Sequence, residues 1–526
     1  MTRMPYYRGQ RLAFAQKAMA ATSSPAATLA ALDVMKKGGN AVDAAVTASA
    51  VLCITEPHMT GIGGDCFAII AWPDGKRVGL NGAGRSARSA TAEWLKQSGL
   101  SNIDPHSIHA VTVPGAIDAW NTLLKAHGSI SLAEALQPAI ALAEDGVPTQ
   151  PRVARDWPEL VDVLARDPGA AMHYLLQGRA PLAGEVMRYP VLARTLRQIA
   201  GEGCDAFYKG EIAANMLATL QAKGSLLSTE DFAATKADWV TPISTQFHGS
   251  EIWEIPPSGQ GLTVLIALNI LKHFELARFE PDSPQRKHLE IEALKRAWAL
   301  RNRHIADPGF AEVPVAELLS EKFAAKLAQS ISPDRAQNIT VHLPQSDTVY
   351  LAVVDQNRLC CSFINSIYWW FGSGITCEKT GITFQNRGAG FSCEPNHPNV
   401  IAPSKRPLHT IIPALATKEG RNDMVFGVMS GNFQPMGHVN MVLNTYVYGL
   451  DPQAALDLPR LGPSGGVVEC ESGVSETVMR DLARRGHKIV ETEELLGGGQ
   501  IIRIDEKTGL LSGGSDPRKD GFAAGF

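Results

Sequence analysis

The chain has no long hydrophobic run and no concentration of positive charge. Its longest apolar stretch, GLTVLIALNIL at positions 261–271, is shorter than the roughly 20 residues that a helix needs to cross a bilayer. Lysines and arginines number 49 against 53 aspartates and glutamates, and the two signs are interspersed. Because no basic tract is present, we expect neither a membrane nor a nucleic acid as a partner.

Paired cysteines are also missing. The eight cysteines include no C-x-x-C pair, which argues against both a zinc site and a disulfide framework, and they lie at positions 53, 66, 204, 360, 361, 377, 393 and 470. We expect reduced, mostly buried thiols and no metal or cofactor. The first 20 residues contain no continuous apolar segment, since residues 6–11 interrupt it, so we predict no secretory signal and a cytoplasmic location.

What is present is the composition of an ordinary globular protein, 45% hydrophobic and 19% charged. With 526 residues the chain could form two to four domains or one large α/β body. Helical patterns dominate the first part, including a long amphipathic segment at 285–308. Short strands and turns dominate from 348 onward, at 348–355, 359–370, 381–388 and 424–431, before helical patterns return at 436–450 and 474–487. No linker separates the two parts, so we predict one packed α/β body.

Local signals near the start of the chain predict two helices. Ser24 is a suitable N-cap with Pro25 in the first turn, and Gly38 or Gly39 supplies the left-handed exit. Asn40 then caps a second, alanine-rich helix. The glycines of GIGGDC at 61–66 do not form a dinucleotide-binding fingerprint, because they precede a strand, and we interpret them as a tight turn.

The stretch PQSDTVYLAVVD at 344–355 predicts a turn followed by a strand. Taken alone, Thr348 is simply the first residue of that strand. The alternative is that Thr348 is a nucleophile that must first be cut free from Asp347.

Seven segments in a fixed order resemble the γ-glutamyltransferase family of N-terminal-nucleophile hydrolases. They are SSPAATLAALDVMKKGGNAVDAAV, EPHMTGIGGD, PPSGQG, SDTVYLAVVD, WFGSGI, KRPLHTIIP and GGSDPRKDG. The resemblance implies a four-layer αββα sandwich built from a precursor that cleaves itself once. It also implies a large subunit, 1–347, and a small catalytic subunit, 348–526, which together form one body, possibly paired into a homodimer. The implied partners are a small-molecule amide and a water or amine acceptor.

The chemistry of an N-terminal threonine supports this. A threonine hydroxyl needs a nearby base, and a free α-amine with a pKa of about 7.7–8.0 supplies one. Cleavage between Asp347 and Thr348 would therefore create nucleophile and base together. For the oxyanion, the resemblance implies the backbone N–H groups of Ser430 and Gly431, with Ser430 in place of a glycine.

The substrate pocket departs from the family pattern. The resemblance implies that Thr410 contacts the substrate, while His409 either binds substrate or is a packed neutral residue. Asn386 belongs to the same pocket. Tyr368 replaces an amide-bearing asparagine, and Arg387 replaces a glutamine or glutamate.

The groups that hold the charged ends of a glutamyl substrate also differ. Gly390 replaces an aspartate that would grip an ammonium. Ala83 aligns with the family's carboxylate-binding arginine, and Arg85 lies two residues further on.

These changes favour an acyl group that has a carboxylate but no α-ammonium, because Arg387 would repel an ammonium and bind a carboxylate. Glutaryl and oxamate-type mono-amides fit this description. Alternatively, Arg387 pairs with a carboxylate of the protein. Tyr368, Trp369 and Trp370 either narrow the pocket or belong to the core, and the short 391–407 segment leaves the acceptor side open.

Three hypotheses therefore remain. The chain is a γ-glutamyl-type amide hydrolase or acyltransferase, a small-amide hydrolase or acylase without glutathione activity, or an idle homologue that only binds.

Overall fold

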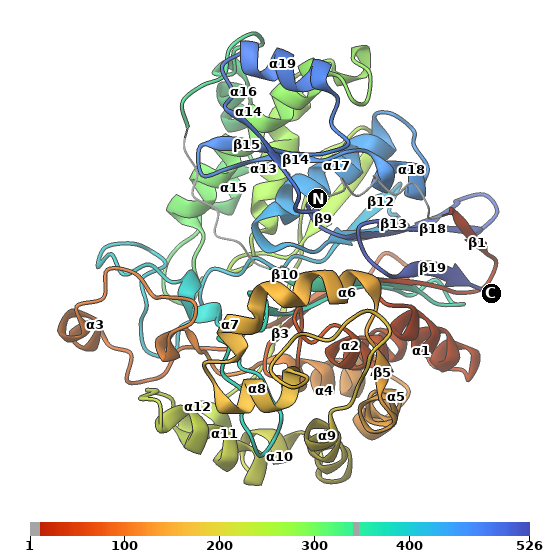
Figure 1. Cartoon of the computed structure of the whole chain (residues 1–526). Helices are drawn as coiled ribbons and strands as arrows, with labels where there is room; N and C mark the ends of the chain where they lie inside the picture. Colours follow the sequence, from red (N-terminus) through yellow and green to blue (C-terminus); the bar gives the residue numbers. More distant parts are fainter. Residues whose placement is uncertain (1–10, 340–346) are drawn as a thin grey trace.

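Two seven-stranded antiparallel sheets lie face to face in the computed structural model, which describes residues 11–339 and 347–526, and helices cover the outer side of each sheet (Figure 1). The first sheet has the order β1 (Ala13–Ala15), β18 (Leu511–Ser515), β17 (Gly499–Ile504), β13 (Arg421–Val428), β12 (Ala414–Lys418), β9 (Ser250–Glu254), β8 (Ile243–Phe247). The second has the order β19 (Phe522–Gly525), β2 (Met19–Thr22), β10 (Asp347–Val354), β11 (Cys360–Tyr368), β3 (Asp65–Ala71), β4 (Arg77–Gly82), β7 (Asp238–Val240). The chain therefore has the predicted four-layer αββα fold.

The helices divide between the two outer layers and the loops around them. On the side of the second sheet are α1 (Pro25–Lys36), α2 (Ala41–Thr55), α3 (Ala92–Ser98), α4 (Ala116–His127), α5 (Leu132–Asp145), α6 (Pro151–Asp156), α7 (Val161–Leu164), α8 (Pro168–Tyr174), α9 (Pro190–Glu202), α10 (Cys204–Tyr208), α11 (Glu211–Gln221) and α12 (Thr229–Ala233). On the side of the first sheet are α13 (Gly261–Leu271), α14 (Pro284–His304), α15 (Val315–Leu318), α16 (Glu321–Gln329), α17 (Gln434–Tyr446), α18 (Pro452–Asp457) and α19 (Glu476–Arg484). Two small sheets complete the fold, β14 (Leu461–Ser464) with β15 (Val467–Glu471) and β16 (Ile489–Thr492), and β5 (Val147–Pro148) with β6 (Val186–Met187).

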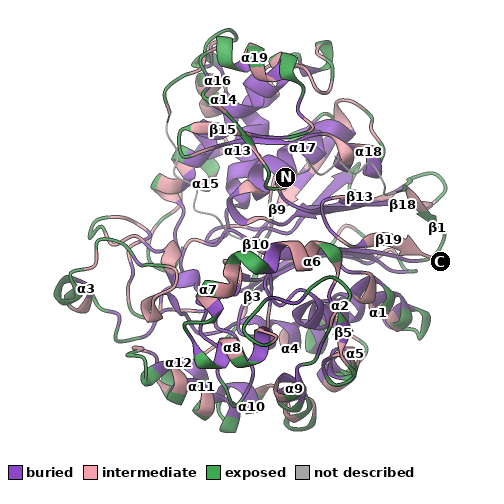
Figure 2. Cartoon of the chain, viewed as in Figure 1, coloured by how far each residue is buried: buried purple, intermediate pink, exposed green. Residues whose placement is uncertain are grey.

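Strand β10 lies deep inside this arrangement and is buried on both faces (Figure 2). Val349, Leu351 and Val353 pack into the core shared with α2, whereas Tyr350 and Ala352 pack into the core between the sheets. This alternation is the period of two that a strand requires. A strand buried on both faces carries apolar residues almost continuously, as β10 does after Thr348.

The capping predictions near the start of the chain are largely confirmed. Helix α1 begins at Pro25, although the Ser24 side chain forms no capping hydrogen bond. Gly38 has the left-handed φ of 97°. The Asn40 side chain accepts from the N–H groups of Val42 and Asp43, which completes a capping box.

Two predictions of secondary structure need correction. The long helix is α14, which ends at His304, and it is not amphipathic, because nearly every side chain from Arg286 to Trp298 is buried. Its charges are accommodated by internal ion pairs, including Arg286 with Glu290 and Arg296 with Glu292. The segment 381–388, predicted as short strand and turn, is instead a loop with one isolated antiparallel bridge, between Thr383 and Thr376, and it ends in the short 3₁₀ turn at Arg387–Gly390.

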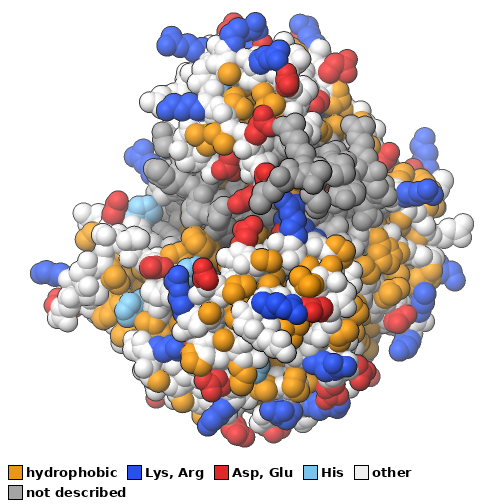
Figure 3. Space-filling model, in the orientation of Figure 1, with side chains coloured by type: hydrophobic (Ala, Val, Ile, Leu, Met, Phe, Trp, Pro, Cys, Tyr) orange, Lys and Arg blue, Asp and Glu red, His pale blue; other side chains and the backbone are white. Residues whose placement is uncertain are grey.

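Surface and cysteine chemistry agree with the composition. On the face shown in Figure 3, basic and acidic side chains are mixed, without a basic tract. All eight cysteines are free thiols, and six of them are buried. Among the described residues, no helix is both long enough and apolar enough to cross a membrane.

Candidate active site

Thr348 lies at an irregularity in the pairing of β10 with β11. Asp347 is opposite Tyr368 and Val349 is opposite Asn365, so Thr348 faces two residues, Ser366 and Ile367, in a β-bulge. Bulges commonly redirect a side chain next to an active site. Residues 344–346 of the turn predicted at 344–347, and the side chain of Asp347, lie outside the described part of the chain, whereas the backbone of Asp347 already belongs to β10.

The Thr348 hydroxyl is buried and lies close to a second hydroxyl. Thr348 Oγ1 donates to Ser366 Oγ at 3.2 Å. Ser366 Oγ also accepts from the Tyr368 backbone N–H at 2.8 Å and from Arg387 Nη2 at 3.3 Å. Ser366 therefore connects the predicted nucleophile to the predicted carboxylate-binding arginine.

Arg387 is fully buried and has no counter-ion among the described residues. Its Nη1 donates to Thr410 Oγ1 at 2.8 Å, its guanidinium lies 4.0 Å from the centre of the Tyr368 ring, and its Nε is a buried donor without a partner. Burial lowers its pKa to about 10, although nearby Tyr368 and Asp65 act in the opposite direction. The alternative that Arg387 pairs with a protein carboxylate is not supported by these contacts.

His409 is held by a buried carboxylate. Its Nε2–H donates to Asp65 Oδ2 at 2.9 Å, and its Nδ1 accepts from the Ile411 N–H at 3.4 Å. Burial, followed by the nearby Arg387 charge, lowers the His409 pKa to about 4. Because both ring nitrogens contact the protein, the geometry favours the packed, neutral interpretation of His409 over direct substrate binding.

Asp65 is itself held rigidly in this region. Its Oδ1 accepts from the backbone N–H groups of Gly84 and Gly115 at 2.8 and 3.2 Å and from Gln385 Nε2 at 2.8 Å. These three N–H donors hold the carboxylate in place. Asp65 therefore places a negative charge near Arg387 without forming an ion pair with it.

The predicted oxyanion donors lie where β13 leaves its sheet. Ser430 has φ 75° and ψ 58°, and Gly431, with φ 32°, opens a 3₁₀ turn. Gln260, just before α13, donates through Nε2 to the carbonyls of Thr410 and Gly431 at 2.6 and 2.8 Å. The left-handed conformation at a non-glycine residue costs about 1 kcal/mol or more, which indicates that the surroundings impose it.

Arg301, on α14, completes the support of this turn. Its Nη1 donates to Gln260 Oε1 at 2.7 Å and to Asn432 Oδ1 at 2.6 Å. Burial lowers its pKa to about 10. Arg301 thus holds both Gln260 and Asn432, one on each side of the turn.

Two predicted substrate residues have other contacts. Asn386 uses both ends of its amide within the protein, since Oδ1 accepts from the Trp369 N–H and Nδ2 donates to the Pro105 carbonyl. Arg85 forms ion pairs with Asp238 and Asp307 and lines a separate cavity of about 210 Å³. The structure does not bring Arg85 into the group around Thr348, so its predicted role has no geometric support.

A larger cavity, of about 330 Å³, borders the turn formed by Ser430 and the residues Gly431–Phe433, which we call the oxyanion turn. Ser430, Asn432 and Phe433 form one part of its wall, and Trp369 and Trp370 form another. Both tryptophans are partly exposed, so they are not fully buried core residues, and the idea that they narrow the acyl pocket stays a prediction. Tyr368, in contrast, is buried against Arg387 and has a left-handed φ of 81°.

Four residues of the site were missed by the sequence analysis, namely Ser366, Asp65, Gln260 and Arg301. Asp65 and Gln260 lie inside quoted motifs, GIGGD and PPSGQG, and a polar residue next to glycines was the available signal. Ser366 and Arg301 lie within an ordinary strand and helix. Their roles depend on contacts between distant segments, which no local pattern reveals.

The structure also brings together His288, Glu292 and His487, whose potential ligand atoms lie within 4.8 Å of one another. The sequence analysis found no such cluster, because His487 is distant in sequence from the other two. His288 Nδ1 and His487 Nε2 share a hydrogen bond of 2.8 Å, and Glu292 is paired with Lys295 and Arg296. These contacts occupy the donor atoms within the protein, and two cations beside Glu292 disfavour a metal ion.

Comparison with known proteins gives consistent matches over nearly the whole chain. The family model described as Gamma-glutamyltranspeptidase matches residues 27–526. A "glutathione hydrolase-like YwrD proenzyme" of Bacillus subtilis is 36% identical over 94% of this chain and 95% of its own length. An "oxamate amidohydrolase proenzyme" of Klebsiella pneumoniae is 34% identical over 97% and 98%. The crystal structure of a cephalosporin acylase from Bacillus halodurans has a TM-score of 0.94 and 41% identity, covering 100% of this chain and 99% of that one.

Proposed function

Because the chain belongs to the gamma-glutamyltranspeptidase family of N-terminal-nucleophile hydrolases, we propose that it cleaves itself between Asp347 and Thr348 and then hydrolyses mono-amides of dicarboxylic acids. The products of self-cleavage are residues 1–347 and 348–526. The matched proteins include enzymes named for different amides, so the family alone does not define the acyl group.

The observation that carries the choice of acyl group is the environment of Arg387. A buried guanidinium without a carboxylate partner is costly unless a ligand supplies the missing charge. Its Nε remains available as a donor, and Nη2 lies one hydroxyl away from Thr348. An acyl group whose far end is a carboxylate would satisfy Arg387 while its carbonyl reaches the nucleophile.

The same environment disfavours a γ-glutamyl group. A γ-glutamyl group carries an ammonium beside its carboxylate, and Arg387 would repel that ammonium. Gly390 is the last residue of the 3₁₀ turn that begins at Arg387, and it has no side chain that could pair with the ammonium. Oxamate, named in one matched enzyme, is itself a dicarboxylic mono-amide without an ammonium.

In the proposed reaction the free α-amine of Thr348 takes the proton from its own hydroxyl. The hydroxyl oxygen attacks the amide carbonyl, and the N–H groups of Ser430 and Gly431 stabilise the oxyanion. The amine then passes its proton to the leaving nitrogen, the C–N bond breaks, and an acyl-threonine ester remains. Water, or an amine acceptor, opens the ester by the reverse sequence.

The test uses two amides with the same leaving group, one γ-glutamyl and one glutaryl, with an uncharged butyryl amide as reference. We expect a higher kcat/KM for the glutaryl amide or for a shorter oxalyl amide, since both acyl groups end in a carboxylate. A charge-assisted hydrogen bond contributes about 1.5–3 kcal/mol, so Arg387→Ala should lower kcat/KM for the carboxylate-bearing amides by about tenfold or more.

The butyryl amide serves as the matched control, because it cannot engage Arg387 and should lose much less. Arg387→Lys, which keeps the charge but not the planar fork, should lie between the wild type and Arg387→Ala. A strong preference for the γ-glutamyl amide would overturn the assignment and identify an ordinary glutathione-type hydrolase.

A further inference from the structure

A glutamate and a histidine meet where α17 packs against the first sheet. Glu254 is the last residue of β9, and His438 lies in the second turn of α17. His438 Nδ1 lies 2.7 Å from Glu254 Oε1, and both side chains are 0% exposed. The second polar atom of each side chain, Glu254 Oε2 and His438 Nε2, is buried without a hydrogen-bond partner among the described residues. The two side chains thus form an isolated polar pair within that part of the chain.

The surroundings of this pair favour its uncharged form. The centre of the Phe426 ring lies 5.2 Å from the centre of the His438 ring. Burial raises the pKa of Glu254 well above its ordinary value and lowers the pKa of His438 to about 3. In the uncharged pair the protonated carboxyl donates to Nδ1 of the imidazole. Such a hydrogen bond depends on direction as well as distance, which apolar packing does not.

Stability alone does not account for a buried pair of this kind. Burying two ionisable groups costs free energy, and apolar side chains of similar volume often give equal or greater stability. A buried polar pair can instead restrict the elements that carry it to a single alignment, because any other leaves its polar atoms unpaired. The elements that the pair joins therefore indicate its role.

The pair joins the two segments that form and support the oxyanion turn. Helix α17 begins immediately after the turn residues Gly431–Phe433. The loop after β9 contains Gln260, whose Nε2 donates to the carbonyl of Gly431 at 2.8 Å. The contacts of Glu254 with His438 and of Gln260 with Gly431 are thus two hydrogen bonds between the same two segments.

Two glycines allow close packing beside the pair. A Cβ on Gly261, the first residue of α13, would lie 2.7 Å from Glu254 Cβ. A Cβ on Gly437, next to His438, would lie 2.4 Å from Val428 Cγ1 on β13. Neither position has room for a side chain, so both helices lie close to the sheet at this point. A shift of α17 along the sheet would therefore break the hydrogen bond of the pair.

We propose that Glu254 and His438 are positioning residues that hold the backbone N–H groups of Ser430 and Gly431 in line with the reacting carbonyl. The inference rests on the proposed function, because those N–H groups are the proposed oxyanion donors. The pair acts through the turn, since its hydrogen bond fixes α17 and α17 continues directly from the turn residues. Loss of the pair should therefore slow acyl transfer while the fold is kept.

The experiment replaces the pair by apolar residues of similar volume, in the double variant Glu254→Met with His438→Leu. Because both polar groups are removed, the free energy of urea unfolding should equal or exceed that of the wild type. The kcat for the glutaryl amide should nevertheless fall about tenfold or more, with a smaller change in KM, since loss of an oxyanion donor costs about 10²–10³ in kcat. Rates are expressed per chain that begins at Thr348, because self-cleavage forms the same kind of oxyanion.

Glu254→Gln is the rescue variant, because the glutamine amide donates to His438 Nδ1 as the protonated carboxyl does. It should keep most of the wild-type kcat. Glu254→Asp is one methylene shorter, so it reaches Nδ1 only if α17 moves, and it should lose kcat. This single variant tests the proposal even where the double variant does not fold.

Asn440→Leu is the matched control, since Asn440 lies on the same helix and its Nδ2 donates to Glu290 Oε2 at 3.0 Å. It removes a buried polar contact of α17 that does not involve the loop after β9. It should therefore change stability without a selective loss of kcat.

The outcomes separate this inference from the proposed function. If the double variant or Glu254→Asp keeps the wild-type kcat, or if Asn440→Leu or Glu254→Gln loses as much as the double variant, the pair does not position the turn and the proposed function stands. If the wild type prefers a γ-glutamyl amide, the proposed acyl group is wrong, and the same comparison on that amide decides the positioning inference, because oxyanion donors serve any amide. If the wild type hydrolyses neither amide, both proposals are overturned.

Discussion

At the scale of single residues, the centre of the site is a chain of three side chains, Thr348, Ser366 and Arg387. Ser366 accepts hydrogen bonds from both of the others. One hydroxyl therefore separates the proposed nucleophile from the proposed carboxylate-binding guanidinium.

The first residue-scale prediction concerns processing. Thr348→Ala removes the hydroxyl that attacks the preceding carbonyl, so it should remain a single 526-residue polypeptide without activity. The wild type should instead contain a chain that begins Thr-Val-Tyr-Leu. N-terminal sequencing and denaturing electrophoresis measure both results.

Thr47→Ala is the matched control for this prediction, because Thr47 is another buried threonine, located on α2. It should still be processed. Thr348→Ser should be processed as well, since it keeps the hydroxyl. An intact chain in fully active wild-type enzyme would disprove the proposed cleavage.

At the scale of elements, the oxyanion turn depends on two helices that do not contain it. Gln260 lies just before α13 and Arg301 lies in the last turns of α14, and together they hold the turn through Gly431 and Asn432. These contacts hold the residues next to the left-handed Ser430, a conformation that costs a non-glycine residue free energy. The helical layer thus positions the proposed oxyanion donors.

We predict that Arg301→Lys lowers kcat more than it changes KM. A lysine cannot replace the guanidinium that bonds Gln260, Asn432 and Asn302, so the turn should lose its alignment. Losing an oxyanion donor outright costs about 10²–10³ in kcat, and a displaced turn should cost about tenfold or more. Steady-state kinetics on the glutaryl amide measure the effect.

Arg296→Lys is the control, since Arg296 is buried on the same helix and pairs with Glu292. It should change stability without the selective loss of kcat. Equal effects of the two variants on kcat and on unfolding would show that Arg301 supports only the fold.

Elements with local signals could be predicted from sequence, and elements defined by distant partners could not. The cap at Asn40 and the alternation of β10 depend on neighbouring residues, and both are confirmed. The segment 381–388 has strand-like residues, but it pairs only with residues 375–377 through an isolated bridge, so no longer strand forms. Helix α14 has a surface-like composition, yet ion pairs allow its burial.

The same distinction holds for the candidate site. The resemblance selected residues 387, 409, 410, 430 and 431, which the structure brings near the segment around Thr348. It could not show that Asp65 holds His409, or that Ser366 lies between Thr348 and Arg387, because these contacts join segments from different strands. Arg85 was selected because it lies two residues after Ala83, the position that aligns with the family's arginine. Its ion pairs with Asp238 and Asp307 lie outside the group around Thr348.

At the scale of the whole molecule, the two proposed subunits are interleaved. In the second sheet, β10 and β11 from the later part of the chain lie between β2 and β3 from the earlier part. In the first sheet, β12 pairs with β9 and β18 pairs with β1 in the same way. Cleavage at 347/348 would therefore leave both sheets intact, and separation of the subunits would require unfolding.

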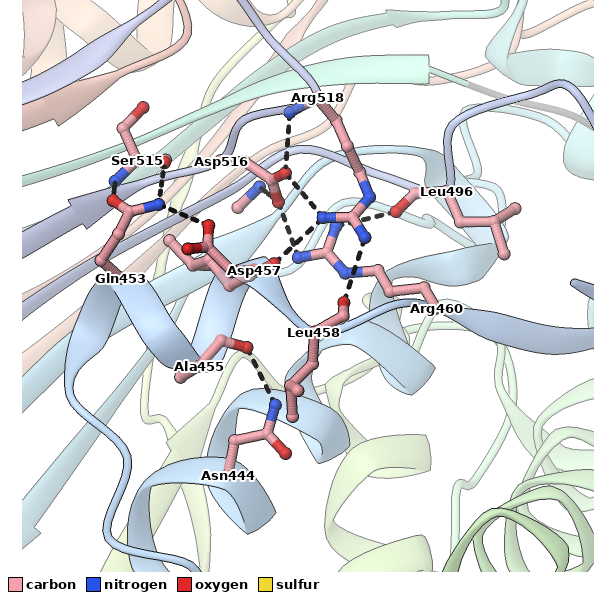
Figure 4. A network of polar contacts seen from close by, with 12 residues as sticks. Asn444, Gln453, Ala455, Asp457, Leu458, Arg460, Leu496, Ser515, Asp516 and Arg518 are labelled. Atoms are coloured by element: carbon pink, nitrogen blue, oxygen red, sulfur yellow. Dashed lines mark hydrogen bonds and ion pairs between the residues drawn. The ribbon is translucent and has the colours of Figure 1, made fainter. Parts of the chain in front are cut away.

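The closing motif GGSDPRKDG joins the end of the chain to the wall of the 330 Å³ cavity beside Ser430. Figure 4 shows Asp516 and Arg518 meeting Arg460 in a buried network that also contacts Leu496. Arg460 Nη2 lies 2.6 Å from Asp516 Oδ2, and Arg460 Nη1 donates to the carbonyl of Leu496 at 2.8 Å. Because Leu496 lines that cavity, the network holds one part of the cavity wall.

The final prediction removes one charge from this network. Asp516→Asn leaves Arg460 without its ion-pair partner, and breaking a buried pair in this way costs about 3–5 kcal/mol.

Burial alone would raise the pKa of the Asp516 carboxyl, but Arg460 and Arg518 outweigh it and hold that pKa below its ordinary value. A carboxyl with a depressed folded-state pKa stabilises the protein above its unfolded pKa of about 3.9, and this contribution is lost as the pH falls through the folded-state value. Urea unfolding should therefore show a large difference between wild type and Asp516→Asn at pH 7, and a shrinking difference below about pH 4. Glu476→Gln, which breaks the exposed pair with Arg480, should cost about 1 kcal/mol or less at pH 7, and a similar small loss for Asp516→Asn would show that the network adds little stability.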